Sequence, residues 1–182
     1  MGIRVNFNKG LAMDAVCSTD DLRPAMGCIY FENGFAYATD GSLLVRNEVS
    51  ECSSIDEEQI GMLNGKMINS ESYKNLLRYD VIVISEDGIE AQKGSQKAFF
   101  YFADIDGKYP NAEKVLQDVL NKATVPMPAI TLNTSNLIKL NKALSGSDKC
   151  TYTFKGQGNA VILQGDGSNH VGLIMPYYSE NV

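Results

Sequence analysis

Apolar and polar residues alternate along three neighbouring stretches near the start of the chain: residues 27–34 (GCIYFENG), 35–41 (FAYATDG) and 42–49 (SLLVRNEV). Short alternating runs of this kind, bounded by turn residues, are typical of β-strands. The pairs Asn33-Gly34 and Asp40-Gly41 lie between the runs, and such pairs readily adopt the positive φ of tight hairpin turns. The pattern therefore predicts a three-stranded antiparallel meander.

A strand and a helix are predicted before this meander. Residues 3–7 (IRVNF) have the composition of a short strand, and residues 7–21 are compatible with a helix that Asn8 would cap. The predicted order of elements is thus strand, helix, strand, strand, strand.

The same order recurs twice further along the chain. Residues 65–69 and 70–79 predict a strand and a helix capped by Asn69 or Ser70, and residues 80–104 predict three strands. Residues 128–132, 133–146 and 150–176 repeat the pattern. The units begin near residues 3, 65 and 128, a spacing of roughly 60. Loose matches can arise by chance, but every helix precedes its three strands. The predicted class is α+β, with antiparallel sheets and helices on one face.

Length and composition are those of an ordinary globular protein. The chain has 182 residues, 44% of them hydrophobic and 21% charged, which is enough for one large domain or two small ones. No apolar run approaches the roughly 18 residues that cross a membrane, and the first residues lack the apolar core of a signal peptide. We expect a cytoplasmic protein without membrane contact.

Candidate catalytic and metal-binding residues are few. Four separated cysteines and a single histidine make a zinc site hard to assemble, so we expect reduced thiols and no metal or cofactor. An EF-hand alignment near residue 104 fails because Phe102 would take the first ligand position. Asp40 has no partner acid or base nearby and is interpreted as a turn residue, and His170 as a loop residue. The sequence does not indicate an enzyme.

Positive charge is concentrated on the predicted helices of an otherwise acidic chain. The formal net charge is −6, so nucleic acid would have to be bound by a local cluster of basic residues. The candidates on the helix surfaces, of which the first is the weakest, are Lys9, Lys74, Arg78, Lys139 and Lys142. The alternative is that they are ordinary solvated side chains.

Four segments resemble the bacterial sliding clamp, the beta subunit of DNA polymerase III. Residues 38–44 (ATDGSLL) are similar to the family's A-T-D-G-H-R-L-A motif, and residues 23–34 to the strand before it. Residues 105–115 (IDGKYPNAEKV) resemble I-D-G-K-F-P-D-Y-R-R-V, and residues 172–178 (GLIMPYY) the terminal V-V-M-P-M-R-L. The segments occur in the family's order, on a chain whose repeat was found independently.

The resemblance implies a DNA-clamp fold of about one and a half domains, whereas the family has three. Residues 1–118 would form a complete domain of two units, 119–127 a linker and 128–182 a half domain of one unit. Apolar residues at 115, 116, 119 and 120 suggest that a helix extends into the connection. A complete ring of the family contains twelve units, so four such chains would close a ring by arithmetic, and an open sheet edge favours a homo-oligomer.

The resemblance also implies a non-catalytic platform in replication or repair. Its partners would be double-stranded DNA, bound through the backbone without sequence specificity, and clamp-binding peptides of polymerases or repair proteins. The alternative is a peptide-binding adaptor that keeps the docking pocket but never encircles DNA. A small enzyme built on this scaffold is a third hypothesis.

A peptide pocket is carried over from the family by position. Its lining would be Met26, Thr39, Gly41, Leu44, Pro110, Val115, Met175 and Pro176. Ser42-Leu43 replaces the family's His-Arg, and residues 112–114 (AEK) replace Tyr-Arg-Arg, so the peptide preference is in doubt. The alternative is that these residues are simply core residues and strand ends.

Overall fold

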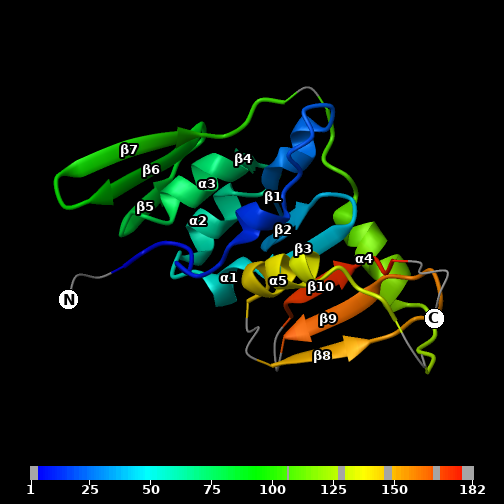
Figure 1. The fold of residues 1–182 in the computed structure, drawn as a ribbon. Helices are drawn as coiled ribbons and strands as arrows, with labels where there is room; N and C mark the ends of the chain where they lie inside the picture. The colour runs from blue at the N-terminus through cyan, green and yellow to red at the C-terminus, as the bar shows by residue number, and fades with distance from the viewer. Residues whose placement is uncertain (1–3, 106, 127–129, 146–148, 166–168, 178–182) are drawn as a thin grey trace.

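Two antiparallel sheets organise the computed structural model, which describes residues 4–105, 107–126, 130–145, 149–165 and 169–177. The larger sheet has seven strands in the order β4-β1-β2-β3-β10-β9-β8, and the smaller has three in the order β5-β6-β7. The smaller sheet projects from one side of the molecule, and β8–β10 lie at the other end (Figure 1). The predicted α+β class and antiparallel pairing are therefore confirmed.

The first predicted meander is present as β1 (Cys28–Glu32), β2 (Phe35–Thr39) and β3 (Leu43–Glu48). Asn33 and Gly34 both have positive φ, 51° and 80°, as the Asn-Gly pair predicted. The meander is therefore specified by its local sequence.

The second unit also follows the prediction. It consists of β4 (Met67–Asn69), α3 (Ser70–Leu76), β5 (Val81–Ile84), β6 (Gly88–Lys93) and β7 (Gln96–Tyr101). The side chain of Asn69 accepts a hydrogen bond from the backbone N–H of Glu71, so Asn69 is the N-cap. Tyr73 and Leu76 face the core from α3.

The third unit contains α5 (Thr134–Ala143), β8 (Cys150–Thr153), β9 (Val161–Gly165) and β10 (Val171–Ile174). Its predicted first strand, residues 128–132, lies partly outside the described residues. In the described part, only Thr131 makes a bridge, with Tyr177. This unit therefore contributes three strands to the large sheet.

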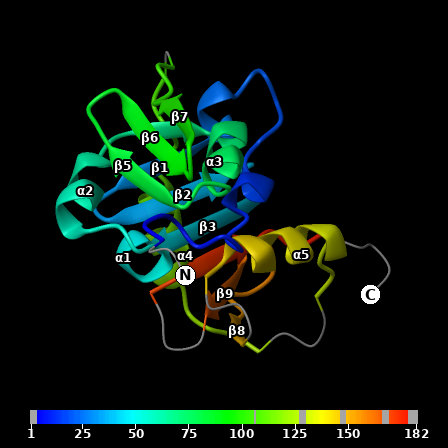
Figure 2. The same cartoon turned by 90° about the vertical axis from the view of Figure 1, so that its left-hand side faces the viewer.

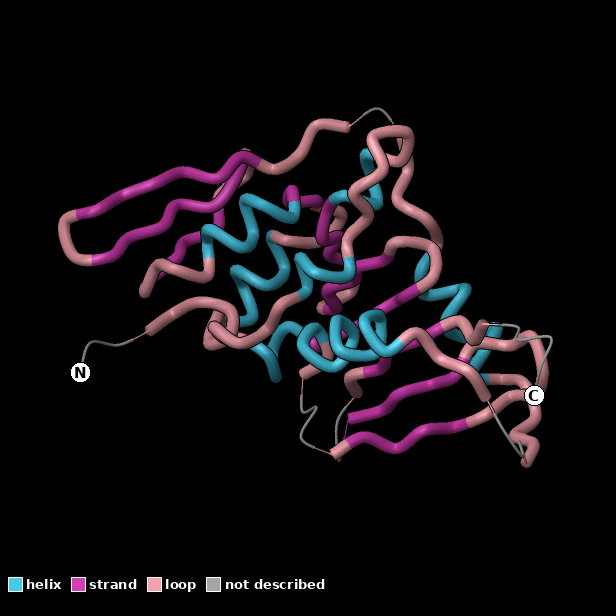
Figure 3. Tube along the Cα trace, in the orientation of Figure 1, coloured by secondary structure: helices cyan, strands magenta, loops and turns pink. Residues whose placement is uncertain are grey.

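The N-terminal segment differs from its prediction. Instead of a helix over residues 7–21, the chain has loop and one short 3-10 helix, η1 (Met13–Val16), and a second, η2 (Pro24–Gly27), follows this segment (Figure 3). Residues 9 and 10 form a turn, and glycine at position 10 disfavours a helix there. Burial of Leu11, Met13 and Val16 stabilises the irregular path instead.

The predicted first strand, residues 3–7, is reduced to two isolated bridges. Val5 pairs in parallel with Val81, and Phe7 pairs with Ser53 in the antiparallel sense. The backbone of Val5 bonds to the edge of β5 on both sides, through Asp80 and Ile82 at 2.8 Å each. The segment therefore contacts the expected sheet edge without extending into a regular strand.

Three further helices complete the chain: α1 (Val49–Cys52), α2 (Glu57–Met62) and α4 (Ala112–Leu120). The apolar spacing around residue 116 predicted α4, and Asn111 caps it by accepting a bond from the N–H of Lys114. Helix α4 runs across residue 118, where the first domain was expected to end; the domain division itself stays a prediction. The two shorter helices were not predicted.

The units are joined in two different ways. Units one and two exchange their first segments: β4 pairs with β1, and Val5 pairs with β5. Units one and three meet through their third strands, because β3 pairs with β10. The large sheet is therefore continuous across the first and third units.

Opposite faces of the large sheet carry separate apolar cores. Ala38, Val45 and Leu163 face the layer that contains η1, α3 and α5, which lies beside the sheets in Figure 2. Leu44 and Leu173 face the opposite way and pack against α4. The period-two alternation of the strands thus places α4 on one face and the other helices on the other.

Candidate peptide groove and candidate DNA-binding surface

The β2–β3 turn is shaped by hydrogen bonds of its own side chains. A carboxylate oxygen of Asp40 accepts bonds from the backbone N–H groups of Ser42 and Leu43, both at 2.8 Å. The hydroxyl of Thr39 donates to the carbonyl of Leu43 at 2.6 Å and accepts from the N–H of Gly41 at 3.1 Å. Asp40 therefore acts as a turn residue, as predicted.

Helix α4 is held against the sheet by a cluster around Glu113. Its carboxylate accepts hydrogen bonds from the Tyr37 hydroxyl at 2.8 Å and from the Arg46 guanidinium at 3.1 Å. Burial by itself would raise the pKa of Glu113, but the hydrogen bonds from Gln117, Tyr37 and Arg46 together lower it. Glu113 is thus ionised at neutral pH, and it fixes the position of α4.

A groove of about 370 Å³ lies between α4, the β2–β3 turn and the end of β10. Seven of the eight predicted pocket residues line it: Met26, Thr39, Gly41, Leu44, Pro110, Val115 and Met175. Pro176 follows Met175 in the chain but does not line the groove. The fold therefore brings together residues from positions 26 to 175 of the chain.

The groove is apolar and open to solvent. Val115 is 51% exposed and Met175 is 42% exposed, whereas Leu44 and Leu173 are buried and form its floor. Exposed methionine and valine beside a buried leucine floor suit an apolar anchor residue, since a thioether adapts to different shapes.

One wall of the groove was missed by the sequence analysis. Gly158, Asn159 and Ala160 line it from the third unit, and Lys122 from the segment after α4. The Lys122 ammonium donates to the Asn159 side-chain oxygen at 2.6 Å. No local signal identifies residues 158–160, because they reach the groove only through the β3–β10 pairing.

A second hollow, of about 590 Å³, lies among η1, α3 and α5 and carries a concentration of basic residues. Its lining includes four of the five predicted DNA-facing residues, namely Lys9, Lys74, Arg78 and Lys142. The N–H of Ala12 bonds to the carbonyl of Lys142 at 3.0 Å, which ties the N-terminal segment to α5. The cations thus come from three units.

The remaining basic residues around this hollow differ from the prediction in two respects. Lys139 is exposed on α5 but does not line the hollow, whereas Lys93, at the end of β6, does. Two carboxylates offset part of the charge: Asp80 lies 3.6 Å from the Lys9 ammonium, and Asp14 lies 4.0 Å from that of Lys74. The Lys9–Asp80 pair is largely exposed and therefore weak, whereas the Asp14 side chain is only 17% exposed.

The cysteines and acidic residues form no site in the described part of the chain. No cluster of metal-ligating side chains occurs there, and Asp106 of the failed EF-hand alignment lies outside it. Cys17, Cys28 and Cys52 are free thiols, and burial raises the pKa of Cys28 to about 11. No helix in this part is both long and apolar enough to cross a membrane.

His170 lies between β9 and β10, as expected of a loop residue, but it is only 2% exposed. Its Nδ1 accepts a bond from the N–H of Glu48 at 3.0 Å, and its Nε2 lies 3.0 Å from a carboxylate oxygen of Glu51. Burial lowers the pKa of His170, and the nearby carboxylates oppose that effect. The ring therefore links β10 to the end of β3 in its neutral form.

Comparison with solved structures identifies the fold. The sliding clamp of the Bacillus subtilis DNA polymerase aligns over 97% of this chain with a TM-score of 0.63 and 14% identity. The DNA polymerase sliding clamp of Pseudomonas aeruginosa aligns over 98% with a TM-score of 0.63 and 12% identity. A Bartonella birtlesii sliding clamp bound to griselimycin aligns over 98% of this chain with a TM-score of 0.62 and 15% identity.

The chain has the fold of bacterial sliding clamps in a shortened form. It spans 64% of the length of the Bacillus subtilis clamp and 68% of that of the Pseudomonas aeruginosa clamp. No protein-family model matches the sequence, and no curated protein does. The likeness therefore concerns the fold.

Proposed function

We propose that this chain is a non-catalytic, sliding-clamp-like platform that associates with DNA in replication or repair, as a processivity or docking factor. The supporting observation is that the clamp fold carries two separate surfaces of different chemistry. An apolar groove lies beside α4, and a basic hollow lies among η1, α3 and α5, against the other face of the large sheet.

The basic hollow suits a phosphate backbone better than base edges. The residues that line it include one carboxylate, Asp14, and five cations: Lys9, Lys74, Arg78, Lys93 and Lys142. The exposed Lys9–Asp80 pair contributes about 0–1 kcal/mol, so a phosphate group can replace Asp80 as the partner of Lys9. Such contacts position a duplex without reading its sequence.

Salt dependence tests this surface. Each phosphate contact contributes about −0.9 to the slope of log affinity against log salt. Replacing Lys142 with Gln should make the slope shallower by about 0.9, whereas Lys114→Gln, on the exposed side of α4, should leave it unchanged. Replacing Lys9, Lys74, Arg78 and Lys142 together with Glu should abolish binding. Unchanged binding by the folded quadruple variant would contradict the DNA assignment.

The groove is proposed to bind an extended peptide through an apolar anchor such as leucine or phenylalanine. A glutamine- and leucine-rich clamp-binding peptide should bind the wild type and fail to bind a Leu44→Asp, Met175→Asp double variant. Because Leu44 is buried, Val115→Asp provides a milder test at a half-exposed position, with Lys114→Asp as the neighbouring control outside the groove. Equal binding by all folded variants would refute the groove assignment.

The two assays also separate the platform from the adaptor. Peptide binding without any salt-dependent DNA binding would identify a peptide-binding adaptor that does not encircle DNA. Binding of both partners, each sensitive only to substitutions on its own surface, is the result expected of a platform.

A further inference from the structure

The third strands of the three units, β3, β7 and β10, are not equally covered. Strands β3 and β10 pair with each other, and this pairing joins the first and third units. No strand in the described residues pairs with the outer edge of β7, which is the outermost strand of the small sheet (Figure 1). Among the third strands, β3 and β10 therefore have paired outer edges, whereas the outer edge of β7 has no pairing strand in the described residues.

Equivalent hydrogen bonds align β7 with β3. The N–H of Val49 bonds to the carbonyl of Gly34, and the N–H of Phe102 bonds to that of Asp87, both at 2.9 Å. Both donors follow the third strand, both acceptors precede the second, and the offset is 53 residues in each case. Lys97, Phe99 and Tyr101 are thus the equivalents of Leu44, Arg46 and Glu48.

In β3, the equivalents form the joint between units. Leu44 lies opposite Leu173, Arg46 lies opposite Val171, and the N–H of Glu48 bonds to His170. In an antiparallel pair, the backbone N–H and C=O groups of successive residues point alternately toward and away from the neighbouring strand. Because the Phe102 N–H bonds to Asp87, every second residue before it, beginning with Phe100, points its backbone groups toward β6. The backbone groups of Lys97, Phe99 and Tyr101 therefore face outward, away from β6.

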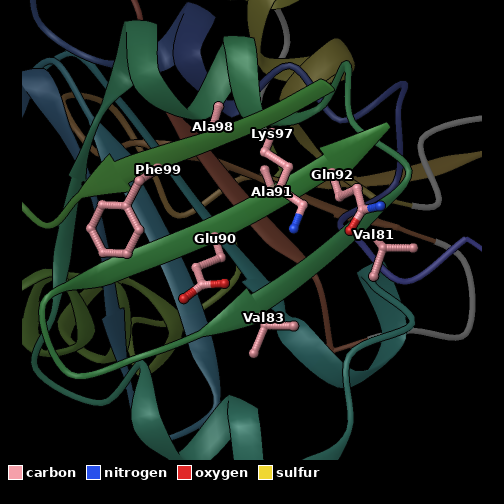
Figure 4. Close-up of a pocket in the computed structure, with 8 residues that line it drawn as sticks. All are labelled: Val81, Val83, Glu90, Ala91, Gln92, Lys97, Ala98 and Phe99. Carbon is pink, nitrogen blue, oxygen red and sulfur yellow. The ribbon is translucent and has the colours of Figure 1, made fainter. Parts of the chain in front are cut away.

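The side chains beside this edge are also apolar. Phe99 is 38% exposed and Tyr101 is 73% exposed, and their rings pack edge to face with centroids 4.7 Å apart. Phe99 shares its sheet face with Glu90 of β6 and with Val83 of β5, the strand farthest from this edge, as Figure 4 shows. Natural edge strands are normally protected by charge, proline or a bulge, and β7 carries only Lys97 as a charged residue.

We propose that β7 pairs in the antiparallel sense with β7 of a second copy of this chain, about a twofold axis. The basis for this proposal is the pairing already present within the chain, in which the third strands of two units, β3 and β10, pair in the antiparallel sense. Two identical antiparallel strands are related by a twofold axis, so one surface serves both copies. The inference goes beyond the proposed function and requires no DNA.

The proposal revises how a ring of four chains would close. Strand β8, at the end of the large sheet opposite β4, is the equivalent of β1 and β5, which are joined by first-segment exchange. The edge strands β7 and β8 therefore occupy different positions in their units, β7 as a third strand and β8 as the equivalent of β1 and β5. We therefore do not expect β7 of one copy to pair with β8 of the next. A closed ring would alternate twofold joints and have dihedral rather than cyclic symmetry.

Solution mass and an edge-blocking proline test the proposal. At about 50 µM, the 19.9 kDa chain should sediment as a species of about 40 kDa or a multiple of it. Phe99→Pro removes an N–H that faces outward and leaves the bonds to β6 in place. The substitution acts twice in a twofold interface, so the dissociation constant should rise at least about 100-fold. Tyr101→Glu, at a more exposed position, should weaken the dimer because a carboxylate replaces the aromatic ring that packs against Phe99 beside the pairing edge.

A proline on β8 is the matched control. The bond from Gly165 to His170 fixes the pairing of β9, and it follows that Tyr152 of β8 also directs its N–H outward. Tyr152→Pro should leave the β7 dimer intact, and circular dichroism should show that each variant is folded. A monomeric wild type, a mass that neither β7 variant reduces, or a β7 dimer lost in folded Tyr152→Pro would each overturn the proposal.

Discussion

Acidification below pH 6.5 should destabilise the protein through one residue, His170. It is the single histidine of the chain, it is 2% exposed, and its Nδ1 accepts a bond from the Glu48 N–H. Protonation would replace that acceptor with a donor, so the folded state disfavours the charged ring. Burial accordingly lowers the pKa of His170 in the folded state.

The sign and the size of the effect follow from proton linkage. Above pH 6.5 the ring is neutral in both states, and the free energy of unfolding is at its full value. As the pH falls below 6.5, the unfolded chain takes up a proton that the folded chain does not. The free energy of unfolding should then fall by at most about 1.4 kcal/mol per pH unit, until the folded-state pKa is reached.

Urea unfolding at a series of pH values between 5 and 8 measures this slope. A His170→Gln variant, which keeps a polar group but cannot titrate, should be less stable at neutral pH and lose the slope between pH 6.5 and 5.5. An NMR titration of the single imidazole gives the pKa directly. A folded-state pKa at or above 6.5, or the same slope in His170→Gln, would refute the reasoning.

Three further predictions concern the packing of buried side chains. Glu113→Ala should lower the free energy of unfolding by about 1–2 kcal/mol, because it leaves the 12%-exposed Arg46 side chain without its carboxylate, while Tyr37→Phe should cost less; equal costs in urea unfolding would argue against the ion pair. Gly172→Ala should cost about 1–3 kcal/mol, because its new Cβ would lie 3.0 Å from Leu140, and an unchanged melting temperature would contradict the close packing of α5 on β10. Tyr73→Phe should be neutral or stabilising by up to about 1 kcal/mol, since the buried hydroxyl of Tyr73 makes no hydrogen bond within the described structure; a clear loss of stability would show that the hydroxyl has a partner.

The sequence by itself determined the elements whose information is local. The alternation of residues 28–48 and the turn pair Asn33-Gly34 specify the first meander, since period-two burial and positive φ leave few alternatives. Asn69 and Asn111 likewise mark helix starts, because a capping side chain bonds within its own first turn. The predicted helix over residues 7–21 failed for the opposite reason: distant core contacts outweighed a weak local propensity.

Only the tertiary structure decided how the units join and what they enclose. The β3–β10 pairing spans more than a hundred residues of chain, and no turn sets its register, so neither the large sheet nor the buried place of His170 was predictable. The same pairing brings Gly158 to the groove beside Leu44, and the bond from Ala12 to Lys142 helps to gather the basic hollow. Resemblance to a known family identified most of the groove residues in advance, but long-range backbone pairing decides which of them share a surface.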